Sequence, residues 1–178
     1  GIAKELDAMG YFLSSANSIN WGRLAPQIVY YISAYCDMAA AEDISVGDEL
    51  DITVPTGNFG NIFAAYLAKR MGLPIRRLVC ASNSNNVLTD FLNTGEYNAR
   101  REFHKTMSPS MDILISSNLE RLLFHLADGN SDYITKLMEQ LKHDGRYKAD
   151  DMIMSRLREK FAGGFATEEQ TSQAIAET

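Results

Sequence analysis

One segment, from Asp51 to Ala81, constrains the fold more than any other part of the sequence. The β-branched run Asp51-Ile-Thr-Val-Pro55 is typical of a short buried strand ended by proline. Apolar spacing predicts a helix over 61–71, closed by Gly72 at the position after its last turn. A second strand follows at Arg77–Ala81. Strand, helix and strand this close together predict a βαβ unit with parallel strands, so the core is expected to be α/β.

Helical patterns flank this unit. Before it, apolar spacing predicts one helix from Asn20 to about Ala41, with Asn17 or Ser18 as a cap and Pro26 in its first turn. After it, we expect helices over 86–93 with a stop near Gly95, 117–127 opened by a capping box, 131–143, 150–161, and 167–176 opened by a second capping box. We therefore predict an α/β core over residues 1–115 and an all-α lobe or insertion over residues 116–178.

Composition excludes several classes of function. The 178 residues carry a net charge of -6, which disfavours nucleic acid as a partner. No apolar stretch approaches a membrane span, and no signal peptide opens the chain, so a cytoplasmic location is expected. Cys36 and Cys80 are interpreted as buried thiols, and the three histidines show no ligand spacing, so no metal is expected. Since the chain starts with Gly1, we interpret it as a piece of a longer protein.

The loop Gly57-Asn-Phe-Gly60 lies where the first predicted strand ends and the helix begins. Free N–H groups and the helix dipole favour an anion such as phosphate at this position. Asn58 and Asn61 add amide donors, and Thr56 adds a hydroxyl. The pattern is neither a Walker motif nor a dinucleotide fingerprint. By pattern alone, a purely conformational role for these glycines and asparagines stays open.

Two motifs at matching spacing identify a family. The chain contains Asn17-Ser-Ile-Asn-Trp-Gly-Arg-Leu-Ala-Pro-Gln27 followed by Val54-Pro-Thr-Gly-Asn-Phe-Gly-Asn-Ile62. Together they resemble the threonine synthases, pyridoxal 5'-phosphate (PLP) enzymes of fold type II, built like tryptophan synthase β. The resemblance extends through Ser108-Pro-Ser-Met-Asp112, Ser117-Asn-Leu-Glu-Arg-Leu-Leu-Phe124 and Ala162-Gly-Gly-Phe-Ala-Thr-Glu-Glu169, so it covers nearly the whole chain.

The resemblance implies a cofactor site and a reaction. It implies that the PLP phosphate contacts Gly57, Asn58, Phe59, Gly60 and Asn61, with Phe59 contributing its N–H while its ring packs beneath the loop. The implied activity is that of a phospholyase of threonine biosynthesis, which converts O-phosphohomoserine to threonine and phosphate. In this reaction PLP acts as the electron sink.

Two family elements are not found in this sequence. The Schiff-base lysine is expected in a Phe-Lys-Asp-like context, and no lysine here has those neighbours: Lys4, Lys69, Lys105, Lys136, Lys142, Lys148, Lys160. Lys69 is interpreted as a solvated helix residue. The chain also stops at Thr178, short of an Asp-Pro-His-Thr-Ala segment whose threonine meets the cofactor's pyridine nitrogen. We therefore assign no catalytic residue and expect the chain alone to be inactive.

Several alternatives stay open at this point. Another fold type II PLP enzyme, such as a threonine dehydratase or cysteine synthase, and a non-enzymatic phosphate-binding module remain possible functions. The Asn17–Arg23 element either caps a helix or contacts substrate. Asn83, Asn85 and Asn86 follow the second strand and are secondary candidates, because α/β sites gather at strand ends. Exposed strand edges make self-association a further expectation.

Overall fold

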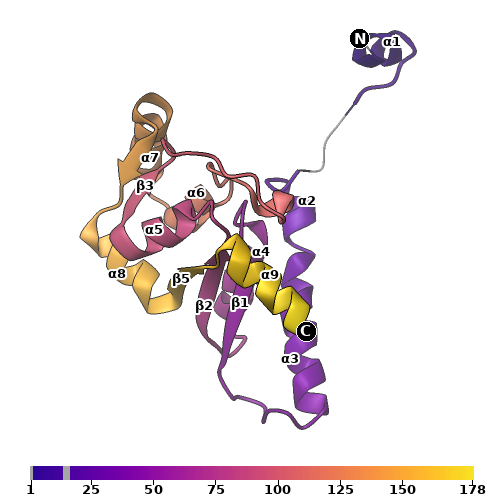
Figure 1. The fold of residues 1–178 in the computed structure, drawn as a ribbon, viewed down its shortest axis with the longest axis vertical. Coiled ribbons are helices and arrows are strands. Elements are labelled where there is room, and N and C mark those ends of the chain that lie inside the picture. Colours follow the sequence, from indigo (N-terminus) through magenta and orange to yellow (C-terminus); the bar gives the residue numbers. More distant parts are fainter. Residues whose placement is uncertain (1, 14–16) are drawn as a thin grey trace.

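The computed structural model describes residues 2–13 and 17–178, which form two β-sheets with helices around them (Figure 1). The strands are β1 Leu50–Pro55, β2 Ile75–Ser82, β3 Glu96–Asn98, β4 Arg146–Lys148 and β5 Phe161–Phe165. The helices are α1 Ile2–Ala8, α2 Trp21–Leu24, α3 Gln27–Ala40, α4 Gly60–Arg70, α5 Val87–Thr94, α6 Leu119–Leu126, α7 Ser131–Asp144, α8 Asp151–Lys160, α9 Glu168–Glu177, and a 3-10 turn at Pro109–Met111.

The main sheet has the strand order β1-β2-β5, and its strands are parallel. Val54 lies opposite Cys80 in the β1–β2 register, and α4 connects these two strands. The predicted βαβ unit is therefore confirmed. Gly72, with φ +107°, directly follows the last turn of α4, and Gly95, with φ +81°, ends α5, as the sequence predicts.

The prediction that all residues after 115 are helical is wrong. Strand β5 pairs with β2, placing Leu78 opposite Phe161, and β4 pairs antiparallel with β3. A Cβ on Gly163 would lie 3.0 Å from the Cα of Thr89, so the missing side chain lets α5 pack closely on β5. The glycine pair of this strand concealed it in the sequence. The division into two parts near residue 115 itself stays a prediction.

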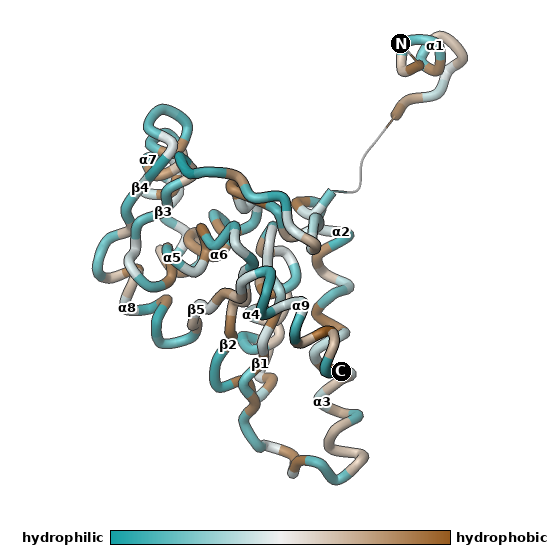
Figure 2. Tube along the Cα trace, viewed as in Figure 1, coloured by the Kyte–Doolittle hydropathy of each residue, from teal (hydrophilic) through white to brown (hydrophobic). Residues whose placement is uncertain are grey.

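Strand β1 is an edge strand and is not fully buried as predicted. Of its six residues, Val54 is the buried one, while Asp51, Thr53 and Pro55 are exposed. Helix α3 lies beyond this edge and carries both hydrophobic and hydrophilic residues along its length (Figure 2), and most of its residues are exposed. Cys36 on α3 is accordingly exposed, so its predicted burial is wrong, whereas Cys80 on β2 is buried as predicted. Burial raises the pKa of the Cys80 thiol to about 11.

The beginnings of two helical regions, residues 20–41 and 117–127, differ from the predictions. The single helix predicted over 20–41 is two helices interrupted at Pro26, and its cap is Asn20, whose Oδ1 accepts from the Gly22 N–H at 2.9 Å. The capping box predicted at Ser117 is absent, since α6 has no side-chain cap. The second predicted box is confirmed, because Thr167 and Gln170 bond reciprocally at the start of α9.

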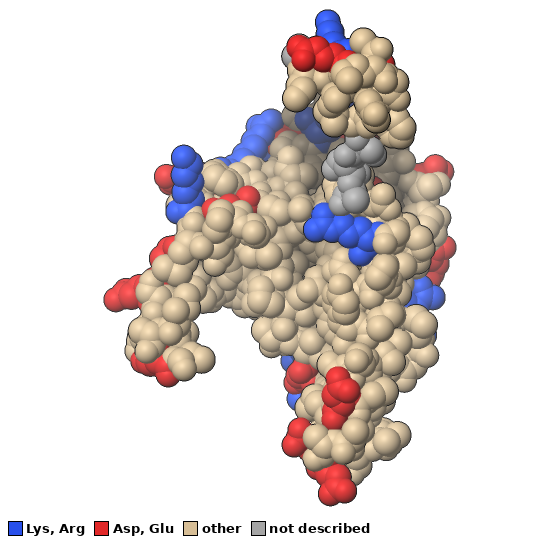
Figure 3. All heavy atoms as spheres, turned by 90° about the vertical axis from the view of Figure 1, so that its right-hand side faces the viewer, with Lys and Arg blue, Asp and Glu red and all other residues tan. Residues whose placement is uncertain are grey.

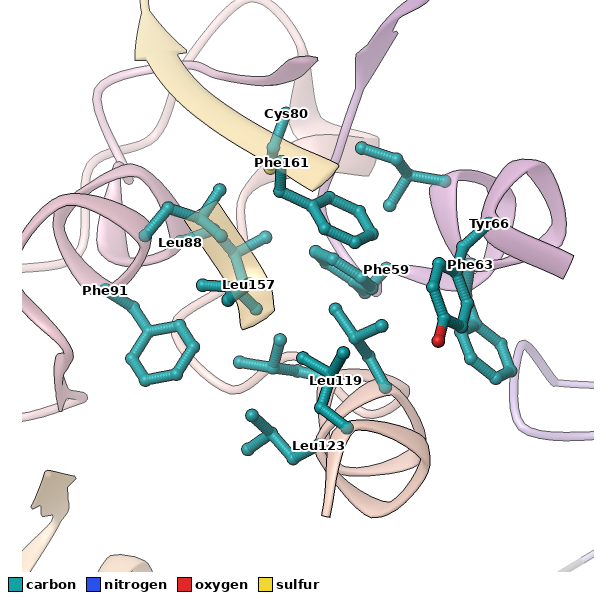
Figure 4. Packing of buried hydrophobic residues seen from close by; sticks show 14 of the residues in the cluster. Phe59, Phe63, Tyr66, Cys80, Leu88, Phe91, Leu119, Leu123, Leu157 and Phe161 are labelled. Carbon is teal, nitrogen blue, oxygen red and sulfur yellow. The ribbon is translucent and has the colours of Figure 1, made fainter. Parts of the chain in front are cut away.

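The hydrophobic core lies between the main sheet and helices α4, α5, α6 and α8. Figure 4 shows the ring of Phe59 beside Phe161, with Leu119 and Leu157 close by. The Phe59 and Phe161 ring centroids are 5.8 Å apart, and only 1% of Phe59 is exposed. The core therefore reaches directly under the loop that opens α4.

Candidate functional site

The loop Gly57–Asn61 joins the carboxyl end of β1 to the first turn of α4. Its turn is made by Phe59, which has φ +63° in the left-handed region, while neither Gly57 nor Gly60 has a positive φ. A left-handed residue followed by a helical one forms a concave arrangement of backbone N–H groups that suits anions. The Phe59 ring packs beneath the loop as predicted, and its burial holds this costly conformation in place.

The loop presents backbone donors without acceptors. Among the described residues, none accepts a hydrogen bond from a backbone N–H of Gly57 to Ile62. The carbonyl groups of the same loop are bonded instead: Gly57 O accepts from Ser116, and Asn58 O accepts from Asn118. A helix N-terminus with unpaired donors is a binding site for a negatively charged group.

Neither glycine is needed for backbone freedom, and Gly57 is needed for close approach. A Cβ on Gly57 would lie 3.0 Å from Ile113 Cδ1 and 3.3 Å from Met111 Cα. At Gly60 it would lie 3.4 Å from Asn118 Nδ2. The segment from Ser110 to Asn118 therefore packs directly on the loop, and a larger residue at position 57 would push it away, whereas a Cβ at position 60 would be in ordinary contact with it.

A pocket of about 240 Å³ opens at the loop. Its walls include the five loop residues, Thr56, Ser18, Arg23, Gln27 and Ser110. Asn20 caps α2, so the predicted capping role of the Asn17–Arg23 element is confirmed; Ser18 and Arg23 line the pocket, and their contact with substrate stays a prediction. Acidic side chains gather at the far end of α3, where it leads toward β1 (Figure 3). None of the residues that line the pocket is acidic.

The side chain of Asn61 is oriented by α3. The Tyr31 hydroxyl donates to Asn61 Oδ1 and, at 3.2 Å, to the Asn61 carbonyl. Burial raises the pKa of Tyr31 to about 12, so the hydroxyl keeps its proton and remains a donor. Because Oδ1 accepts this bond, the Nδ2 group of Asn61 is left as a donor for a ligand.

Similar proteins were found by comparison of sequence and structure, although no family model matches the chain. The human "Threonine synthase-like 1" is 48% identical over 170 residues, which are 95% of this chain and 23% of that protein. Threonine synthase from Pseudomonas aeruginosa is 40% identical over 168 residues, covering 94% of this chain and 34% of that protein. A structure of PLP-bound threonine synthase from Brucella melitensis superposes with a TM-score of 0.87 at 42% identity, over 98% of this chain and 36% of that one.

The chain belongs to the threonine synthase family. The resemblance found in the sequence and the predicted PLP fold type II are thereby confirmed. The chain spans about a quarter to a third of the length of the relatives it matches.

The asparagines after β2 lie apart from the loop Gly57–Asn61 in this member of the threonine synthase family. Asn83 and Asn85 donate to Asp112 Oδ1 at 2.7 and 3.0 Å, and Asn86 accepts from Arg101. Hydrogen bonds, first of all from the Thr106 N–H, hold the pKa of Asp112 below its usual range. These asparagines tie down the segment 104–112 and do not line the loop pocket. The Thr56 hydroxyl, expected as an anion donor, donates to Val54 O at 2.7 Å.

Other candidate residues lie away from the site. Lys69 is half-buried and donates to the Ile75 carbonyl, so its interpretation as a solvated residue is wrong. Within residues 2–13 and 17–178, no group of three His, Cys, Asp or Glu side chains could hold a metal ion. No helix of these described stretches has the length and apolar character to cross a membrane. A larger groove of about 480 Å³ lies between α3 and β1, but its walls are mainly apolar.

Proposed function

We propose that this chain is the part of a threonine synthase that holds the phosphate of PLP, in a longer protein that converts O-phosphohomoserine to threonine and phosphate. The proposal rests on one observation: six successive N–H groups, from Gly57 to Ile62, have no acceptor in the described structure. The relatives support it, since they carry the name threonine synthase and one of their structures contains PLP.

The loop fits the phosphate of PLP in chemistry and in shape. Backbone N–H groups at the start of α4 are fixed dipoles, and they stabilise a dianion without side-chain rearrangement. Asn58 and Asn61 add neutral amide donors, and Arg23 adds positive charge at the pocket wall. When bound, PLP supplies an electron sink for the reaction. The role of Gly57, Asn58, Phe59, Gly60 and Asn61 is to bind and orient its phosphate.

We further propose that the Schiff-base lysine lies outside these 178 residues. None of the seven lysines lines the described pocket, and Lys69 on α4 is bonded to the Ile75 carbonyl. The chain alone is therefore expected to bind a phosphate group without catalysing the reaction. No catalytic residue is assigned within it.

A ligand titration tests the phosphate site. Isotope-labelled chain is titrated with PLP, with inorganic phosphate and with pyridoxal, which lacks the phosphate, while amide resonances are followed by NMR. We expect PLP and phosphate to shift the amides of residues 57–62, and pyridoxal to leave them unchanged. Failure of PLP to move these amides in the folded chain would overturn the assignment.

The alternatives separate in an assay of the longer protein. A threonine synthase releases phosphate from O-phosphohomoserine and forms threonine, whereas a dehydratase or a cysteine synthase-like enzyme does not. A non-enzymatic phosphate-binding module would show the amide shifts in the chain and no turnover in the longer protein. A cytoplasmic location belongs to the same proposal.

Self-association of the isolated chain is also proposed. The outer strands of the main sheet, β1 and β5, each have one unpaired edge, and such edges pair readily with other chains. Val29 and Tyr30 on the neighbouring α3 are about three-fifths exposed. Light scattering during gel filtration should show a mass above that of the 19.8 kDa monomer, increasing with concentration. A constant monomer mass would contradict this expectation.

A further inference from the structure

The segment Leu114–Asn118, which precedes α6, donates hydrogen bonds to backbone carbonyl groups of the loop Gly57–Asn61. Ser116 Oγ donates to Gly57 O at 2.8 Å. Asn118 donates twice to Asn58 O, from its backbone N–H at 3.1 Å and from Nδ2 at 2.9 Å. These bonds join positions about 60 residues apart in the sequence. They are therefore tertiary contacts, independent of the local turn.

The bonds fix the direction of the loop donors. In a planar trans peptide the C=O and the N–H of the next residue point in opposite directions. The bond to Gly57 O thus sets the direction of the Asn58 N–H, and the bonds to Asn58 O set that of the Phe59 N–H. Since the carbonyls point toward the start of α6, the N–H groups are directed away from it. A donor array held before the ligand arrives needs little rearrangement on binding.

Asn118 is held in a way that does not serve helix capping. It is completely buried at the cap position of α6, yet its side chain makes no cap bond. Its Nδ2 also donates to Ser18 O at 3.2 Å, while its Oδ1 is buried without a partner in the described structure. An unpaired buried acceptor destabilises a fold. The side chain is thus placed for what Nδ2 contacts, the Asn58 carbonyl and the Ser18 segment.

Tyr97 anchors this segment from the small sheet. Its hydroxyl donates to Leu114 O at 3.0 Å and accepts from the Ser116 N–H at 2.8 Å. Its ring stacks on Tyr147 with centroids 5.1 Å apart, and it meets Phe91 edge to face. Ser116 is therefore bonded on one side to a fully buried tyrosine and on the other to the loop.

We infer that Ser116 and Asn118 are positioning residues for the phosphate-binding loop, with Tyr97 acting on it through Ser116. This inference rests on the proposed function of residues 57–61. It differs from a merely structural role, because it requires the two residues to set the direction of particular N–H groups.

The test compares Ser116→Ala and Asn118→Ala with Asn130→Ala in the 178-residue chain. Asn130 caps α7, accepting from the Tyr133 N–H at 3.0 Å. Its replacement is the control, because it also removes a side-chain hydrogen bond of an asparagine at the start of a helix, but one far from the loop in sequence. Phosphate and PLP affinities are measured by amide shifts, with thermal unfolding recorded for each variant. We expect affinity about tenfold weaker for each of the first two variants, and unchanged for Asn130→Ala.

Ligand-free spectra provide a second readout. Ser116→Ala should move the amide resonance of Asn58 most, and Asn118→Ala that of Phe59. A general loosening of the fold would not produce this pairing. Unchanged affinity in both variants, or shifts spread evenly through α4, would overturn the inference.

A conservative pair covers the case in which Asn118→Ala does not fold. Tyr97→Phe keeps the stacked ring and removes the hydroxyl, and we expect it to weaken phosphate binding a few-fold. Tyr147→Phe is its control, since the Tyr147 hydroxyl has no hydrogen bond in the described structure. Equal affinity of these two variants would contradict the role of Tyr97. If wild-type chain binds neither phosphate nor PLP, the proposed function itself fails, whereas binding that no variant weakens overturns only the positioning inference.

Discussion

The N-termini of α4 and α8 differ in whether a side chain accepts a hydrogen bond from their first backbone N–H groups. At α8 the side chain of Asp150 accepts from the Ile153 N–H at 2.8 Å, so a side chain satisfies one of the first donors of the helix. At α4 the corresponding position is Phe59, which has no cap bond and leaves successive N–H groups without acceptors. Asn130 and Thr167 cap α7 and α9 in the manner of α8. Helices α3, α5 and α6 also lack a side-chain cap, but it is the start of α4 that lines the pocket beside Arg23.

On the proposed function, this difference separates a helix end that a cap stabilises from one that binds a ligand. A capping side chain at α4 would satisfy the donors at about 1 kcal/mol of gain, and would compete with an incoming anion for them. The fold instead uses Ser116 and Asn118 to bond the loop carbonyls. The binding site proposed at α4 therefore depends on the adjoining pocket and on the bonded loop carbonyls as well as on the missing cap.

The largest effect is expected from Gly60→Asp at the start of α4. Its carboxylate would stand among the free N–H groups, and two like charges about 4 Å apart repel by roughly 4 kcal/mol at an effective dielectric constant near 20. We expect phosphate and PLP affinity to fall by about a hundredfold or more. The melting temperature should hold or rise, because an acidic side chain suits a helix N-terminus.

Gly60→Ala is the control for this change. Its Cβ would be in ordinary contact, 3.4 Å from Asn118 Nδ2, and carries no charge. Binding should weaken only slightly. If the aspartate variant binds PLP as well as the alanine variant does, the start of α4 is not an anion site.

A smaller effect, on stability alone, is expected from Asp150→Ala at α8. Loss of the cap should lower the free energy of unfolding by about 1 kcal/mol, or the melting temperature by roughly 2–4 °C. Phosphate affinity should stay at the wild-type value. A parallel loss of affinity in this variant would remove the contrast between the two helix ends.

The smallest effect is expected in the pH dependence of stability, through Asp112, which lies in the segment next to the loop and not at a capped helix end. Hydrogen bonds from Thr106, Asn83 and Asn85 hold the pKa of Asp112 below its unfolded value, which is about 3.9. Its contribution to stability is therefore complete above that value and is lost as pH falls through the lower folded pKa. Denaturant midpoints measured between about pH 5 and pH 2.5 should fall less steeply for Asp112→Asn than for wild type. Equal slopes would exclude this contribution.

Local patterns in the sequence were sufficient to predict the elements that carry the candidate site. Strand β1, the loop and α4 follow from β-branched, glycine and apolar spacing, because each is determined within a few residues. Strand β5 could not be predicted, since its stability comes from pairing with β2 and from the close approach of α5 at Gly163. The small β3–β4 sheet depends in the same way on the stacking of Tyr97 and Tyr147.

The tertiary hydrogen bonds that hold the loop could not be predicted from local sequence patterns either. Ser117 and Asn118 matched a capping pattern, but their side chains bond to Asn58 and Ser18 across the fold. Phe59, and neither glycine of the loop, also makes the left-handed turn. A bulky residue adopts a left-handed conformation only where packing compensates for it, and no local pattern encodes that packing.

The burial of the Phe59 ring also leads to an expectation for the kinetics of anion binding. Because the left-handed turn and the hydrophobic core share one residue, the cradle is complete as soon as the core has formed. Anion binding should then be a single fast association step, with an observed rate linear in ligand concentration and no slow phase. The same residue couples the loss of the site on heating to melting of the core, so both should occur in one transition.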